Sequence, residues 1–164
     1  MSTSSGSVAT EGCRPATADD LPRLVELAAQ ARDELSQNKG GRVWALADAR
    51  QHPFDERLRR ELSDPSVLVL VGTIDDAVIG YAVGAVRELA GGDRIGVLSD
   101  VYVEPGGREI GVGDQLLEDV LSWCGAQGCV GVDSLALPGD RHTKNFFEAH
   151  GLVARAIIVH RSLT

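Results

Sequence analysis

Aromatic residues and cysteine are scarce in this chain of 164 residues, at 4% for the aromatics and three for cysteine. Cys13, Cys124 and Cys129 form no plausible disulfide framework, and no C-x-x-C or nearby pair of histidines accompanies them to make a zinc site. The sequence therefore predicts no metal centre. We expect free, mostly buried thiols in a reducing, cytoplasmic protein.

Long apolar runs are also lacking. No stretch is apolar enough to span a bilayer, and the opening S-T-S-S-G-S has no apolar run of the kind found in secretion signals. We expect no membrane partner, a flexible tail over residues 1–11 and one domain over residues 12–164.

Positive charge is in deficit, with 16 Lys and Arg against 24 Asp and Glu, for a formal net charge of −8. An acidic surface disfavours nonspecific nucleic-acid binding, so no nucleic-acid partner is expected. It is compatible with a cationic or amine-bearing substrate.

The hydropathy pattern predicts an α/β (α+β) chain. The expected strands cover 13–15, 67–71, 77–86, 94–103, 129–137 and 153–160, and the expected helices cover 21–38, one or two stretches of 42–62 broken at His52-Pro53, 113–127 and 140–151. The second to fourth strands should run antiparallel in order. The strand from 129 should lie parallel to the strand at 94–103, because a single helix connects them.

The most informative stretch is Leu98–Leu117, a strand, a loop and a helix. Gly111 and Gly113 stand where the helix begins, and residues without a Cβ let a ligand approach the main chain closely. The first amides of a helix have no partner within it and attract anions such as pyrophosphate. An ordinary strand-to-helix turn would also place glycines here, so both interpretations stay open.

Two common phosphate loops do not fit this turn. Gly113 is followed by Asp114 and Gln115 rather than the Lys and Ser/Thr of a Walker A loop. Leu116 stands where a dinucleotide-binding fingerprint needs its third glycine. The pattern that fits is R-x-x-G-x-G, at Arg108, Gly111 and Gly113, and it resembles the acetyl-coenzyme A signature of the GNAT superfamily of N-acetyltransferases.

A second stretch, Asp140–Leu152, resembles another GNAT signature, N-x-x-A-x-x-x-Y-E-x-x-G-F. Asp140 replaces the usual Asn and is expected to cap a helix, whereas Glu148 and Gly151 match the pattern. Phe147 occupies the position of the family's Tyr, the usual proton donor to the departing thiolate. Phenylalanine has no proton to donate.

The resemblance implies a GNAT fold, with a mixed, mostly antiparallel sheet of about six to seven strands and about four helices. It implies direct transfer of an acetyl group from acetyl-CoA, the cosubstrate, to a primary amine of a small molecule or peptide, and a homodimer. The cosubstrate-binding residues that it implies are Val101, Tyr102, Val103, Arg108, Glu109, Ile110, Gly111, Val112, Gly113, Asp114, Asp140 and Phe147.

For catalysis, Asp100 is the candidate general base, and Ser99 is a candidate for orienting a water molecule. A carboxylate that caps or bridges at the strand end is an equal alternative for Asp100. Trp44, His52 and Phe54 are candidates for the acceptor side. His142 and His150 are expected to be surface or capping residues, and the basic cluster of Arg50, Arg57, Arg59 and Arg60 is expected to be a solvated helix face.

Two further interpretations come from other functional classes. A GNAT-fold module that binds acyl-CoA as a sensor or structural ligand, without turnover, is favoured by the missing Tyr. An acetyltransferase toxin acting on aminoacyl-tRNA is disfavoured by the acidic charge.

Overall fold

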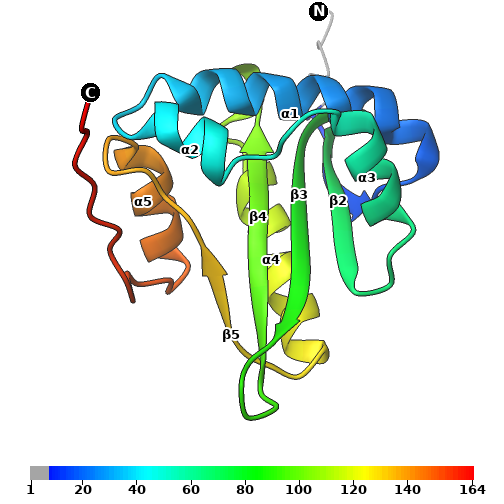
Figure 1. Ribbon diagram of the computed structural model, residues 1–164. Helices are drawn as coiled ribbons and strands as arrows, with labels where there is room; N and C mark the ends of the chain where they lie inside the picture. The colour runs from blue at the N-terminus through cyan, green and yellow to red at the C-terminus, as the bar shows by residue number, and fades with distance from the viewer. Residues whose placement is uncertain (1–7) are drawn as a thin grey trace, which may run out of the picture.

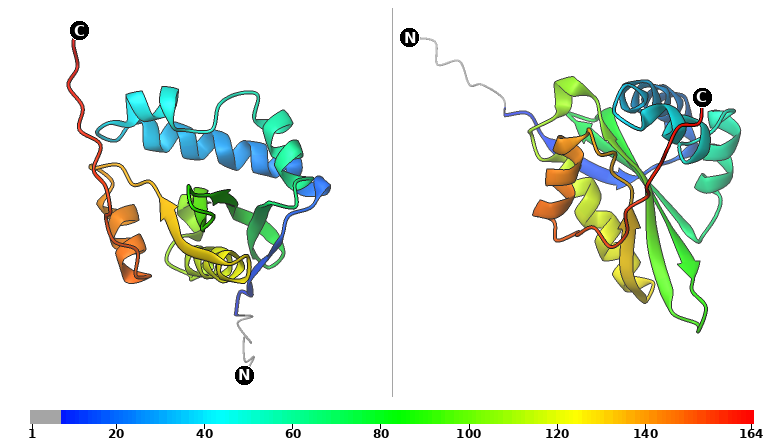
Figure 2. Two further views of the ribbon diagram at one scale, coloured as in Figure 1. Left: turned by 60° about the horizontal axis from the view of Figure 1, so that its bottom comes forward. Right: turned by 60° about the vertical axis from the view of Figure 1, so that its left-hand side comes forward.

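A computed structural model describes residues 8–164 and shows a central sheet between helical layers (Figures 1 and 2). The strands are β1 (Glu11–Pro15), β2 (Val67–Ile74), β3 (Ala77–Glu88), β4 (Arg94–Val103) and β5 (Cys129–Ser134). The helices are α1 (Leu21–Ser36), α2 (Gly41–Ala47), α3 (Phe54–Leu62), α4 (Val112–Ala126) and α5 (Arg141–Ala149), with short 3₁₀ turns at Ala18–Asp20 and Pro105–Gly107.

The sheet order is β1-β2-β3-β4-β5, antiparallel up to β4 and parallel between β4 and β5. This confirms the predicted meander and the parallel crossover through α4. The hairpin between β2 and β3 turns at Asp75 and Asp76, both with positive φ, a conformation that aspartate tolerates better than most residues. The mixed α/β architecture is the one that was expected.

The strand count is lower than predicted: the described residues form five strands rather than six or seven. Residues 153–160, predicted to be a strand, form no strand, because their main chain has no neighbouring strand to bond with. β5 ends at Ser134, three residues earlier than expected. At the other end, β1 begins at Glu11, inside the segment expected to be flexible, and most of that segment lies outside the described residues.

Two apolar clusters cover the two faces of the sheet. One packs α1 and α3 on Val83, Tyr81 and Tyr102, and the other packs α4 and α5 on Ala82, Leu98 and Val103. Figure 2 shows α1–α3 and α4 as layers on opposite sides of the sheet. Leu116, Leu117, Val120 and Cys124 form the apolar face of α4 and are completely buried. The two faces of β4 therefore pack against two separate helical layers.

A break in register interrupts the pairing of β3 with β4. Val83 pairs with Asp100, but the next residue, Gly84, pairs with Leu98. Ser99 is thus an extra residue in β4 with no partner in β3, which is a β-bulge. Bulges often lie beside functional sites because they redirect the neighbouring side chains.

Candidate functional site

The candidate site opens where β4 and β5 separate. Their parallel pairing ends at Leu98 with Ser134, whereas β4 continues along β3 until Val103 pairs with Gly80. In the described structure, residues 99–103 have no strand on the β5 side. Their free main-chain groups can pair with an extended ligand, in the way that strand edges bind peptides.

A cavity of about 970 Å³ lies at this separation, bounded by β4, the end of β5, α1, α2, α5 and the start of α4. The sequence-predicted residues that line it are Ser99, Asp100, Val101, Tyr102, Val103, Arg108, Glu109, Gly111, Gly113, Asp114, Asp140 and Phe147. Two predicted residues do not line it. Val112 is buried in the α4 cluster, and Ile110 lies partly exposed outside the cavity.

The turn before α4 has the geometry of an anion site. Gly111 is the N-cap with φ of 88°, a conformation that glycine adopts without strain, and no side chain caps the helix. The first amides of α4 are therefore available at the positive end of the helix dipole, beside the cavity. A phosphate group is a suitable ligand for such a helix end.

Arg108, predicted to bind the cosubstrate, already makes contacts within the protein. Its Nη2 lies 2.7 Å from Glu34 Oε2 and its Nε donates to the Val103 carbonyl oxygen at 2.7 Å. Its guanidinium lies 5.4 Å from the centre of the Tyr102 ring. The hydrogen bond from Arg108 holds the pKa of Glu34 below its ordinary value, and burial together with Glu34 raises the pKa of Tyr102 to about 12. Arg108 thus ties the turn to α1 and to the end of β4.

Asp100 lies on the wall of the cavity with both carboxylate oxygens occupied. Arg50 donates to Oδ1 at 3.2 Å and to Oδ2 at 2.7 Å. The Tyr81 hydroxyl donates to Oδ1 at 2.9 Å, and Ser99 Oγ donates to Oδ2 at 2.7 Å. An incoming amine would have to displace one of these donors to reach the carboxylate. The geometry therefore matches the alternative role that the sequence left open, a bridging carboxylate.

The buried ion pair corrects the prediction that Arg50 belongs to a solvated face. Its side chain is 8% exposed and also binds Glu61 Oε2 at 2.7 Å. Burial opposes the charge on Arg50, but Asp100 and Glu61 outweigh it and raise the pKa of the guanidinium. Burial also removes water from around Glu61, which raises the pKa of that carboxyl.

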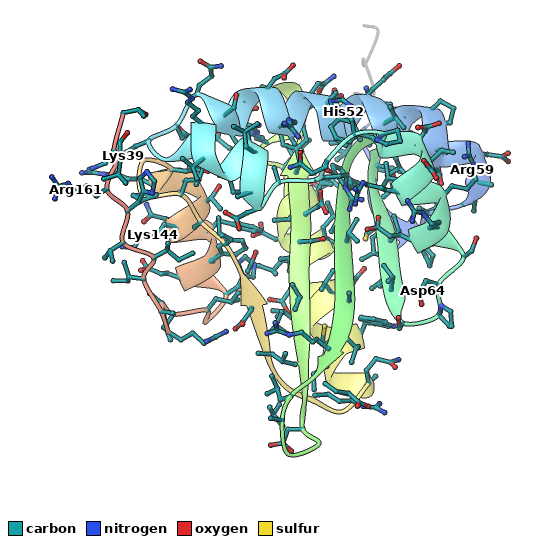
Figure 3. The ribbon with its side chains drawn as sticks, in the orientation of Figure 1. Lys39, His52, Arg59, Asp64, Lys144 and Arg161 are labelled. Carbon is teal, nitrogen blue, oxygen red and sulfur yellow. The ribbon has the colours of Figure 1, made fainter. Side chains whose placement is uncertain are left out.

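The rest of the basic cluster behaves as predicted. Arg57, Arg59 and Arg60 are exposed on α3, and Arg59 projects from the surface in Figure 3. Arg59 and Arg60 lie 4.0 Å and 3.9 Å from the acidic residues one turn earlier. Such exposed pairs contribute little to stability.

Of the three acceptor-side candidates, only Trp44 lines the cavity. Phe54 is 3% exposed and packs in the α1–α3 cluster. His52 stacks on it, with ring centroids 3.9 Å apart. Both were predicted because this region helps to shape the acceptor site in GNAT-like folds, but Phe54 fills the core and His52 is exposed outside the cavity.

Helix α5 confirms one capping prediction and carries the phenylalanine that replaces the tyrosine of the family signature. Asp140 caps the helix, since its carboxylate accepts from the Thr143 amide at 3.0 Å. Phe147 is 7% exposed and touches both the cavity and the α4 cluster. No hydroxyl is present where the family signature has its Tyr.

His150 joins α5 to α4. Its Nδ1 lies 2.8 Å from the Phe146 carbonyl oxygen and its Nε2 lies 3.2 Å from Asp114 Oδ1. The nearest carboxylate was not evident from the sequence, because Asp114 is far from His150 along the chain. His142 lines the cavity on its exposed side.

Sequence reasoning missed Arg50, Tyr81 and Glu34 as parts of the site. One signal was available for Arg50: it lies between α2 and α3, outside the regular charge spacing of α3. Tyr81 stands among apolar residues of a strand and Glu34 among other polar residues of a helix, with nothing in the local pattern to single either out.

The described side chains contain no group of three or more His, Cys, Asp or Glu arranged to hold a metal ion. Among the described helices, none combines the length and apolar character needed to cross a membrane.

Solved structures share this fold at low sequence identity. A mutant of the BH1408 protein of Bacillus halodurans is 16% identical, with a TM-score of 0.79, over 93% of this chain and 99% of that one. The aminoglycoside acetyltransferase meta-AAC0020 from an uncultured soil metagenomic sample, in complex with sisomicin, is 17% identical, with a TM-score of 0.70, over 94% and 95%. AAC(6')-Iy, in complex with the bisubstrate analog CoA-S-monomethyl-acetylneamine, is 21% identical, with a TM-score of 0.69, over 94% and 99%.

Sequence comparison identifies the family of the chain. No curated protein matches the chain by sequence. The family model described as "Acetyltransferase (GNAT) family" matches residues 27–152, which include the turn before α4, the separation of β4 from β5 and the whole of α5. The chain therefore belongs to the GNAT acetyltransferase family.

Proposed function

We propose that this chain transfers an acetyl group from acetyl-CoA to a primary amine, directly and within a ternary complex. The observation that carries the proposal is that the unpaired part of β4 and the uncapped start of α4 open into one cavity. An acyl-CoA needs both features, an edge for its amide-bearing arm and a site for its pyrophosphate. The CoA-containing ligand of AAC(6')-Iy supports the same donor class.

In this proposal, the pyrophosphate binds the amides at the start of α4, near Gly111 and Gly113. The pantetheine arm pairs with the main chain of residues 101–103. Arg108 stabilises the turn from behind, through Glu34 and the Val103 carbonyl. The acyl end then lies toward Asp100 and the α1–α2 side of the cavity, where the acceptor would enter.

Direct transfer requires a neutral amine and a stabilised thiolate. Asp100 directly precedes residues 101–103, which are proposed to bind the pantetheine arm. To act as a base, however, it would have to lose its contact with Arg50, Tyr81 or Ser99. We propose that Asp100 mainly holds these three groups in place and that water removes the proton from the amine. Ser99, with its hydroxyl at the cavity wall, is placed to orient that water.

The acceptor class is the finer part of the proposal. The sisomicin complex of one structural neighbour shows an aminoglycoside acetyltransferase with an amine-rich ligand. The net charge of −8 is also compatible with a cationic acceptor. A small-molecule or peptide amine is therefore the acceptor class to test first.

A second candidate function is an acyl-CoA-binding module without turnover. Phe147 favours it, because this side chain can pack against a thioester but has no proton for the thiolate. Both candidates predict CoA binding, and only transfer predicts thiol release.

The test is calorimetric titration with acetyl-CoA, followed by a thiol-release assay against a panel of amines. Burial raises the pKa of Cys124 to about 11 and that of Cys13 to about 12, so these thiols stay protonated at neutral pH and react slowly with the thiol reagent. Binding with amine-dependent release supports transfer. Binding without release across the panel supports the binding module, and no binding would overturn both.

A further inference from the structure

One histidine joins α5 to α4 beside the turn proposed to bind the pyrophosphate. His150 is the C-cap residue of α5, its side chain is 12% exposed, and the centre of its ring lies 4.8 Å from that of Phe146. Phe146 in turn faces the start of α4, because a Cβ built on Gly113 would lie 3.7 Å from its Cε2. The imidazole is therefore held against the first turn of α4.

The surroundings of this ring favour its charged form. Nδ1 lies 2.8 Å from the carbonyl oxygen of Phe146, which can only accept a hydrogen bond. Nε2 faces two carboxylates of α4, with Asp114 Oδ1 at 3.2 Å and Glu118 Oε1 at 3.8 Å. A neutral imidazole carries a proton on one nitrogen only, whereas here both nitrogens face acceptors. An imidazolium has a proton for each of them.

Asp114 needs a cation because of its place in the helix. It is the third residue after the N-cap Gly111, in the first turn of α4, and it lines the cavity. A carboxylate at this position can turn back to accept a hydrogen bond from the N-cap amide, as in a capping box. There it would crowd the first amides of the helix and repel an anionic ligand. In this structure Asp114 Oδ1 lies against His150 instead.

Two other cations of these elements are engaged elsewhere. Arg108, in the turn before α4, and Lys144, labelled on α5 in Figure 3, each pair with a glutamate, at 2.7 Å and 3.3 Å. Among the ion pairs of residues 8–164, the cation within 4.0 Å of Asp114 is His150. Loss of the charge on His150 would therefore leave a carboxylate uncompensated beside the start of α4.

We propose that His150 is a positioning residue for the pyrophosphate of the cosubstrate. Its charged ring holds Asp114 away from the first amides of α4 and offsets the charge of that carboxylate, so the helix start is free to receive a phosphate group. The inference rests on the proposed binding of acetyl-CoA at this turn. It concerns the affinity for the cosubstrate and not the chemical step.

The first test is a double-mutant cycle, measured by calorimetric titration with acetyl-CoA. His150→Gln keeps a hydrogen-bond donor near Asp114 but removes the charge, and it should weaken binding about fivefold or more. Asp114→Asn alone should bind at least as tightly as the wild-type chain. Combining the two substitutions should restore the affinity, because no carboxylate then needs to be compensated.

Glu118 provides the matched control. It also lies within ion-pair distance of His150, but it is one turn further along α4 and does not line the cavity. Its side chain is 61% exposed, close to the 62% of Asp114. Glu118→Gln should therefore not restore binding when it is combined with His150→Gln. Circular dichroism and urea denaturation of each variant distinguish a loss of affinity from a loss of folding.

The pH profile of binding is a readout that needs no change at His150. Histidine loses its charge as the pH rises through neutrality, whereas carboxylates ordinarily stay ionised between pH 6 and pH 9. The affinity of the wild-type chain for acetyl-CoA should therefore fall over this range, and that of Asp114→Asn should fall less. Titration of the ligand itself, and of His142 on the cavity wall, contributes to both proteins.

The wild-type titration separates this inference from the proposed function. A wild-type chain that does not bind acetyl-CoA overturns both. Binding that His150→Gln leaves unchanged, or a loss that Asp114→Asn does not restore, overturns the inference alone. If His150→Gln does not fold, equal pH profiles of the wild type and Asp114→Asn overturn it. A loss that is restored by Asp114→Asn but not by Glu118→Gln supports it.

Discussion

Arg50 and Asp100, fifty residues apart in sequence, form a two-point ion pair beside the cavity, with Nη2 2.7 Å from Oδ2 and Nε 3.2 Å from Oδ1. Their side chains are 8% and 11% exposed. Arg50 also neutralises Glu61, so one guanidinium serves two carboxylates. A pair this buried is costly to break from one side, because the remaining charge has no water around it.

Arg50→Met should therefore lower the free energy of unfolding by about 3–5 kcal/mol, since it leaves Asp100 facing Glu61 without a cation. Urea denaturation monitored by fluorescence measures the loss. Arg59→Met is the matched control, because Arg59 is 62% exposed, and it should change stability by no more than about 0.5 kcal/mol. Comparable losses in the two variants would show that the Arg50 ion pair is not structural.

Gly113→Val should weaken acetyl-CoA binding at least tenfold in calorimetric titration while the protein stays folded. A Cβ at this position would lie 3.7 Å from Phe146 Cε2 and from Val103 Cγ2, an ordinary contact distance, and the side chain would narrow the cavity. Gly111 is a poorer test, because its φ of 88° strains any other residue.

Gly125→Ala provides the control for that experiment. Gly125 lies in the last turn of α4 with nothing near its missing Cβ, so the change should leave CoA affinity unaltered and stabilise the helix by about 0.5–1 kcal/mol. A folded Gly113→Val protein with unchanged affinity would remove the start of α4 from the proposed pyrophosphate site.

Phe147→Tyr should raise kcat by about tenfold or more, if the chain is a transferase in which protonation of the thiolate limits the rate. The new phenol would be placed where the family signature has its proton donor. Steady-state thiol release across pH measures the change, and activity should fall at high pH as the phenol ionises, near its ordinary pKa of about 10. Phe147→Leu controls for altered packing, and a gain in that variant too would contradict a role for the hydroxyl.

Asp20 should make stability depend on pH. Arg14 donates to both of its oxygens, at 2.8 Å and 2.9 Å, which lowers the pKa of the carboxyl; burial opposes this, and the Thr17 amide reinforces it. A lowered folded-state pKa adds stability above the unfolded pKa of about 4 and loses it as the pH falls below that value. Asp20→Asn should cost about 1–2 kcal/mol at pH 7.

Urea denaturation at pH 7, 5, 4 and 3 checks this expectation. The difference between the wild-type chain and Asp20→Asn should narrow below pH 4. The neighbouring variant Asp19→Asn, at an exposed position, should track the wild-type chain throughout. A constant gap for Asp20→Asn at all four pH values would show that ionisation of Asp20 does not stabilise the fold.

Local sequence patterns predicted most of the fold and the part of the site that is proposed to bind the cosubstrate. The strand at 94–103, the glycines before α4 and the cap at Asp140 are each encoded within a few residues, so spacing alone indicated them. The strand expected at 153–160 failed for a physical reason, since alternation of side chains shows what a strand would bury but not whether a neighbour is present.

The acceptor side was harder to predict, because its contacts join distant parts of the chain. From the sequence, Arg50 was grouped with the exposed arginines of α3 and predicted to be solvated, although it lies between α2 and α3. Its burial depends on Asp100 and Glu61 converging on it in three dimensions. The distinction between a solvated and a buried charge is a tertiary property, and charge spacing along one helix does not contain it.

The extra residue at Ser99 changes the phase of side-chain alternation in β4. In an uninterrupted strand, Leu98 and Asp100 would point to the same face, as residues two apart do. Here Leu98 packs in the α4 cluster, whereas Asp100 meets Tyr81 and Arg50 on the α1 side. One inserted residue thus lets a single strand contribute apolar side chains to one layer and, two positions later, a carboxylate to the other. If Ser99 paired regularly with β3, Asp100 would point into the apolar α4 layer; because Ser99 is bulged out of the pairing, Leu98 and Asp100 behave as consecutive residues of the strand.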